Sequence, residues 1–207
     1  MPARSKRPPP AANYPRVEVA TRAELRAWLR AHHADGGGAW IVTRKRDAGG
    51  TLGWNDIVEE ALCFGWIDSL PRKLDDQRSM LLVTPRKPGS AWSAKNKRHV
   101  EDLERRGLMQ AAGRAVVADA RARGTWSALD EVSALVVPPD LEAALAARSP
   151  ARRHWDAFPP SVRRGILEWI SQAKRASTRA RRVDETARLA RDNVRANQWP
   201  RDKPARR

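Results

Sequence analysis

The sequence predicts an α+β fold, with a small N-terminal three-stranded sheet with helices, followed by a mostly helical C-terminal half. Two patterns predict this fold class. Segments in which apolar and polar residues alternate among β-forming side chains are confined to the region before residue 90. From Ser93 onward, apolar residues recur at helical spacing, and capping or helix-ending residues separate the segments. Hydrophobic residues make up 41% of the chain, which is enough to bury a core.

The sheet-containing part is expected to mix helices and strands. Thr21 followed by Glu24 is a capping-box pattern that opens the first helix. Gly65 is placed to end the second helix, and Asp75-Asp76 suits the turn between the last two strands. In chain order we expect a helix over 21–32, a strand over 39–45, a helix over 54–64, and strands over 66–70 and 80–84.

The second half is expected to contain helices only. Ser93 is a favoured N-cap residue, and Gly107 and Gly124 are placed to end the first two helices. We expect helices over 93–106, 109–123, 127–135, 139–147, 161–174 and 178–193.

Composition divides the chain into one domain with basic ends. Residues 1–18 are expected to form a flexible basic arm, and residues 196–207 a disordered basic tail. Between them, residues 19–195 are predicted to form a single α+β domain, with a sheet-containing part over about 19–90 and a helical part over about 91–195.

The net charge is +16, and most of it lies at the two ends of the chain. Residues 1–16 carry +4 and residues 174–207 carry +8. Basic ends attract nucleic acid weakly and without sequence preference, although a solvated surface explains the same charge. No segment is apolar enough for a signal peptide or a membrane span. The single cysteine excludes an internal disulfide, and we expect a cytoplasmic protein.

The basic loop before the Ser93 helix is a candidate anion site. A helix N-terminus presents free N–H groups and favours negative charge, and Arg86 just before it can donate two hydrogen bonds to an oxyanion. The alternative is that Ser93 only caps the helix, Trp92 only packs, and the lysines are solvated. The predicted ligand-binding residues for a small anion are Arg72, Lys73, Thr84, Arg86, Ser90, Trp92, Ser93 and Asn96.

No residue is assigned a catalytic or metal-binding role. Asp75-Asp76 suits a turn, and Asp68 follows a strand where a basic residue can pair with it. Cys63 lies between apolar neighbours, with no histidine at local spacing, so a buried thiol is expected. The sequence indicates no cofactor and defines no oligomeric state. It favours a protein that is not an enzyme.

Several short motifs in a fixed order resemble a known family. The motifs are Ala61–Asp68, Lys73–Asp76, Thr84–Arg86, Ser90–Ser93 with Asn96, Ala-Lys-Arg near residue 174, and Thr-Arg-Ala-Arg-Arg from Thr178. Together, over roughly residues 20–190, they resemble the YdeI/OmpD-associated (bacteriocin-protection) family. The resemblance implies a link to bacteriocin or antimicrobial-peptide resistance or stress, and it brings no catalytic residues. This chain has Leu82-Val83 where the family usually has Arg-Phe.

Three functions remain open on these grounds. The first is an uncharacterised member of that family that binds an anionic ligand. The second is a basic nucleic-acid-binding accessory protein. The third is a small-molecule enzyme that uses Asp68 or the Asp75-Asp76 pair.

Overall fold

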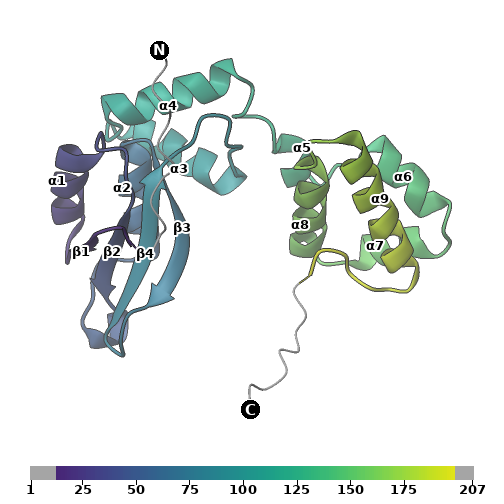
Figure 1. The fold of residues 1–207 in the computed structure, drawn as a ribbon, viewed down its shortest axis with the longest axis horizontal. Coiled ribbons are helices and arrows are strands. Elements are labelled where there is room, and N and C mark those ends of the chain that lie inside the picture. Colours follow the sequence, from purple (N-terminus) through teal and green to yellow (C-terminus); the bar gives the residue numbers. More distant parts are fainter. Residues whose placement is uncertain (1–12, 199–207) are drawn as a thin grey trace. The chain divides into compact units, whose positions relative to one another are not determined.

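The computed structural model describes residues 13–198. The chain divides after Ala128 into an N-terminal unit and a C-terminal unit, each with its own core (Figure 1). The sequence pattern predicted a single domain over residues 19–195. Helices precede and follow the turns at this boundary, so no change from helix to strand periodicity marks it.

The N-terminal unit contains a four-stranded mixed sheet in the order β1-β2-β4-β3 (Figure 1). Strand β4 (Arg78–Pro85) pairs in antiparallel orientation with β2 (Ala39–Arg44) on one side and with β3 (Trp66–Lys73) on the other. β1 (Arg16–Glu18) pairs with β2 in parallel.

The predicted count of three strands was therefore wrong, and residues 16–18 do not belong to a flexible arm. A strand of three residues is too short to show an alternating pattern, and it forms by pairing with β2. Residues 1–12 of the predicted arm lie outside the described residues.

The helices of the N-terminal unit agree closely with the predicted ones. They are α1 (Arg22–His32), α2 (Trp54–Cys63), α3 (Ala94–Arg105) and α4 (Ala111–Ala122), with a short 3-10 helix, η2 (Arg46–Ala48). The Thr21 hydroxyl accepts a hydrogen bond from the N–H of Glu24 at 3.2 Å, as the capping-box pattern predicted. Gly65, with a φ of +77°, lies in the turn between the end of α2 and the start of strand β3.

The two faces of the sheet build two separate apolar clusters. Ile41, Leu81 and Val83 face α1 and α2 and belong to the main core. Trp40 and Leu82 alternate with them and form a smaller cluster on the opposite face. Since successive side chains of a strand point to opposite faces, the continuous apolar stretch of β4 indicates a strand buried on both sides.

One buried carboxylate ties α1 to α2. Glu60 is 3% exposed and accepts hydrogen bonds from Arg22 at 3.0 Å and from Arg26 at 2.7 Å. Arg26 also donates to the carbonyl oxygen of Leu108, which joins the loop before α4 to the same network. A buried charge of this kind is tolerated only with such partners.

The C-terminal unit is a bundle of helices around its own core. The helices are α5 (Asp130–Ser133), α6 (Pro139–Ala146), α7 (Ala151–Ala157), α8 (Pro160–Ser171) and α9 (Ala176–Arg191). Sequence analysis did not predict α7, because its seven residues contain little apolar periodicity. Trp155 of α7 is nevertheless fully buried. No helix among residues 13–198 is long and apolar enough to cross a membrane.

The end of the described chain packs onto this bundle. Ala196 is 2% exposed and belongs to the core of the C-terminal unit, so the predicted disordered tail does not begin at residue 196. The remainder of that predicted tail, from residue 199, lies outside the described residues.

Candidate functional site

The candidate site lies where β4 ends and the chain turns toward α3. The backbone N–H of Arg86 donates to the carbonyl oxygen of Gly65 at 3.0 Å, which anchors the first residue of the loop beside the start of β3. The loop then turns at Lys87–Ser90, closed by a 3.2 Å hydrogen bond between these residues. Gly89 has a φ of +81°, a conformation that glycine adopts without strain.

The guanidinium of Arg86 is held by an aromatic ring and two carbonyl groups. Its Cζ atom lies 3.8 Å from the ring centroid of Trp92, which is itself 1% exposed. Its Nη2 atom donates to the carbonyl oxygens of Ala91 at 2.5 Å and Ser90 at 3.4 Å. These contacts fix the orientation of the planar group.

Arg86 has unused hydrogen-bonding capacity. Its Nε atom is buried without a partner, and no described carboxylate forms an ion pair with it. Burial lowers the pKa of Arg86 to about 10, because desolvation disfavours the charged form. The side chain is still a cation at neutral pH. An oxyanion beside it would satisfy both the charge and the unpaired donor.

A cleft of about 280 Å³ opens next to this guanidinium. One wall is the loop from Arg86 to Ser90 with Trp92, and the other is the outer part of α4 with Thr125. The only carboxylate among the lining residues belongs to Asp119, which accepts a hydrogen bond from Arg123 at 2.7 Å. The cleft therefore has a net positive lining that suits a small anion.

Three of the eight predicted ligand-binding residues line this cleft, namely Arg86, Ser90 and Trp92. Arg72 and Lys73 do not join them. In the β3–β4 ladder Trp66 is opposite Pro85, next to Arg86, and Arg72 is opposite Met80. At about 3.3 Å per residue, Arg72 therefore lies roughly 20 Å along the hairpin from the Trp66–Pro85 pair.

The remaining three predicted residues, Thr84, Ser93 and Asn96, lie outside the cleft. Ser93 caps α3 by accepting from the N–H of Asn96 at 3.2 Å, which was the alternative considered for this serine. The Thr84 methyl group packs against Gly38, and a Cβ atom added at Gly38 would lie 2.8 Å from that methyl carbon. None of these three side chains lines the cleft.

Sequence reasoning missed the second wall. Val116, Asp119 and Ala120 of α4 and Arg123 at its C-terminal end lie about 30 residues further along the chain, and their i, i+3, i+4 and i+7 spacing gives only a helix face. No local signal connects that face with Arg86. The connection depends on the packing of α4 against α2.

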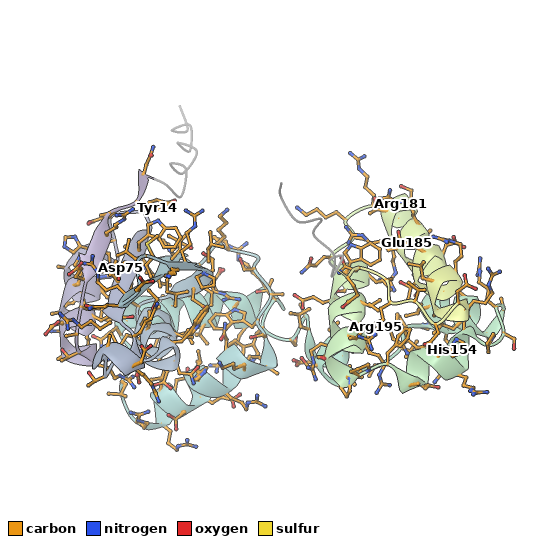
Figure 2. All side chains as sticks on the ribbon, turned by 90° about the horizontal axis from the view of Figure 1, so that it is seen from below. Tyr14, Asp75, His154, Arg181, Glu185 and Arg195 are labelled. Atoms are coloured by element: carbon orange, nitrogen blue, oxygen red, sulfur yellow. The ribbon has the colours of Figure 1, made fainter. Side chains whose placement is uncertain are left out.

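The carboxylates weighed as catalytic groups are all occupied. Asp68 accepts a hydrogen bond from the indole N–H of Trp54 at 3.1 Å. Asp75 accepts from the backbone N–H groups of Gln77 and Arg78 at the hairpin turn, where Figure 2 labels it. A hydrogen bond from the Arg78 guanidinium lowers the pKa of Asp75, which keeps it ionised. The contacts of Asp75 stabilise the turn.

Cys63 is buried, and burial raises the pKa of its thiol, which disfavours the reactive thiolate. Within residues 13–198 no group of three or more His, Cys, Asp or Glu side chains is placed to hold a metal ion.

Part of the arginine-rich last helix is used inside the C-terminal unit. Arg179 donates twice to Asp140, at 2.7 and 2.9 Å, and Arg182 lies 4.9 Å from the ring of Trp169. Arg181 is exposed on α9 (Figure 2). The basic helix therefore offers a nucleic acid fewer free cations than its sequence indicates, and nucleic-acid binding stays a prediction.

Comparison with known families gave two matches, one in each unit. Residues 134–193 match the family described as "Bacteriocin-protection, YdeI or OmpD-Associated", and residues 17–116 match a domain of unknown function, DUF8412. No match was found among curated proteins or among solved structures. The resemblance seen in the sequence is confirmed over 134–193, whereas the motifs between residues 61 and 96 fall in the other match.

Proposed function

We propose that this chain, whose residues 134–193 carry a bacteriocin-protection, YdeI or OmpD-associated domain, binds a small oxyanion through Arg86 in its N-terminal unit. The ligand class is a phosphate or a carboxylate. The family match and the proposed site lie in different units, so the ligand-binding role rests on the geometry around Arg86 and not on the family.

The observation that carries the proposal is a half-buried guanidinium that lacks an acidic partner among the described residues. Most other half-buried arginines here have a carboxylate, as Arg22 and Arg26 have in Glu60. Arg86 has only carbonyl oxygens and the ring of Trp92. A cation taken partly out of water without a counterion costs free energy, and a bound oxyanion offsets that cost.

Binding fits this cleft better than catalysis does. The lining residues include no histidine or cysteine, and the Asp119 carboxylate is already paired with Arg123. A nucleophile or general base requires a neighbouring group that activates it. The cleft supplies cations and hydrogen-bond donors, which hold an anion in place.

The direct test is titration of the full chain with inorganic phosphate and with acetate, followed by calorimetry and thermal denaturation. Replacing Arg86 by Gln removes the charge and the fork of donors, and we expect roughly tenfold weaker binding, or a complete loss. Arg98→Gln, at an exposed position of α3, changes the net charge equally and serves as the matched control.

Two outcomes would refute the proposal. In one, neither anion raises the melting temperature of the wild-type chain. In the other, Arg86→Gln and Arg98→Gln weaken binding equally, which would mean that only the overall positive charge attracts the anion.

A protective role against bacteriocins is proposed on the family description alone. Expression of the chain in a bacteriocin-sensitive bacterium should raise the lethal bacteriocin concentration. If the Arg86→Gln variant protects as well as the wild type, then protection does not depend on the anion site.

A further inference from the structure

A second cleft of about 310 Å³ lies between the sheet and the first turn of α2. Trp54 and Ile57 of α2 form one side, and Pro71 and Leu81 of the β3–β4 hairpin form the other. Its surface is mainly apolar. We call it the Trp54 cleft, and it is separate from the cleft at Arg86, with which it shares no lining residue.

The cleft exists because the hairpin is longer than the helix that covers it. Val83 and Leu81 are buried beneath the helices, but Ser79, two residues further along the same face, is half-exposed. α2 begins only at Trp54, so α2 does not cover the sheet face beyond Leu81.

Trp54 is held at the mouth of this cleft with much of its ring in water. It is 46% exposed, among the most exposed large apolar side chains of residues 13–198. The hydrogen bond from its Nε1 atom to Asp68 fixes the orientation of the ring. A fixed and exposed tryptophan beside an apolar hollow is typical of a binding surface.

The polar rim of the Trp54 cleft is basic. Lys45 and Arg46 are among its lining residues, and no acidic residue is. Lys45 donates to the backbone carbonyl oxygens of Asp75 and Asp76, at 3.1 and 2.8 Å. These acceptors are uncharged, so they do not neutralise the positive charge of Lys45. Arg46 lies beside Gly53, where a Cβ atom would be 3.5 Å from its Nη2 atom.

Two carboxylates beside lining residues of the cleft have other partners. Asp56 accepts from the N–H of Gly53 at 2.8 Å and pairs with Arg22 at 3.2 Å. Asp68 is bound to Trp54. Within the described part of the chain, Arg46 forms no ion pair within 4 Å.

We infer that the Trp54 cleft binds a small amphiphilic anion, with an aryl or acyl body against Trp54, Ile57 and Leu81 and an oxyanion group near Arg46. The apolar floor supplies affinity for the body, and the basic rim selects the anion over a neutral molecule of the same shape. Arg72 also lines the cleft, but its guanidinium lies over Trp40, which belongs to the cluster on the opposite face of the sheet, so its charge is directed away from the cleft.

The test compares 2-naphthoate with its neutral counterpart, 2-naphthylmethanol, by ligand-observed NMR on the full chain. The wild type should bind naphthoate more tightly. Arg46→Gln should weaken naphthoate binding roughly tenfold and leave the alcohol unchanged. Trp54→Ala should weaken both ligands by about tenfold, because it removes shared apolar contact area.

Three controls separate this inference from the proposed function and from misfolding. Arg98→Gln should leave naphthoate binding unchanged. Because the Arg86 cleft is itself proposed to bind carboxylates, the titrations are repeated in the Arg86→Gln background, where Arg46→Gln and Trp54→Ala should still weaken naphthoate binding. Trp54→Phe should retain most of the affinity, and thermal unfolding shows whether each variant is folded. The inference is overturned if the wild type binds both ligands equally, if Trp54→Ala has no effect, or if only Arg86→Gln abolishes naphthoate binding.

Discussion

Replacing Gly113 by Ala should destabilise the N-terminal unit, because α4 packs against the end of α2 at this glycine. A methyl group at Gly113 would lie 2.7 Å from the carbonyl carbon of Cys63 and 2.8 Å from the carbonyl oxygen of Leu62. Ordinary contacts between carbon atoms are about 3.5–4.0 Å, so the two helices must separate by roughly 1 Å. Backbone atoms cannot move aside as a flexible side chain can.

The magnitude follows from two opposing terms. Overpacking a close contact lowers the free energy of unfolding by about 1–3 kcal/mol. Ala has a higher helix propensity than Gly, which raises that free energy by up to about 1 kcal/mol. We expect a net loss of about 1–2 kcal/mol. Gly165 in α8 is the matched control, since a Cβ atom there meets nothing within 4 Å. Gly165→Ala should stabilise the C-terminal unit by about 0.5–1 kcal/mol.

The assay is denaturant unfolding monitored by hydrogen exchange, which is measured on peptides from each unit. The chain has two cores, and a single global signal would mix the unfolding of the two units. Gly113→Ala should lower the unfolding midpoint of peptides from α2 and α4, and leave those from α8 unchanged. A Gly113→Ala variant as stable as the wild type would show that the close approach of α4 to α2 is not present in solution.

Three further outcomes are expected. Glu60→Ala should cost about 3–5 kcal/mol in denaturant unfolding, since it leaves two half-buried arginines without their shared carboxylate, and a loss below 1 kcal/mol would contradict this network. The thiol of Cys63, whose pKa is raised by burial, should react with Ellman's reagent only after denaturation, so rapid reaction of the native chain would place it at the surface. A hydrogen bond from Arg179 lowers the pKa of Asp140. The ionised carboxylate therefore contributes stability above about pH 4, and this contribution is lost as the pH falls through the lowered pKa. Circular dichroism between pH 5 and 2 should show that Asp140→Asn loses less stability on acidification than the wild type does.

The candidate site shows where local sequence information ends. Arg86 and Trp92 are six residues apart, and the short basic loop between them is the local signal on which the anion-site prediction rests. Arg72 was grouped with them because it is near in sequence, but an extended hairpin carries it to the far end of the strands. The wall from α4 was not predicted, since only the packing of helices brings Arg123 to this loop.

The sequence by itself determined most of the secondary structure. Capping residues such as Thr21 and Ser93, helix-ending glycines such as Gly65, and the short apolar stretches of β2 and β4 act over a few residues, and these signals can be read locally.

Only the tertiary structure decided the rest. β1 has three residues and exists through its pairing with β2, and α7 is held by the burial of Trp155. The division after Ala128 and the two clefts likewise depend on which faces pack together. The physical reason is that the free energy of these features comes from burial between segments far apart in the chain, which no short window of sequence contains.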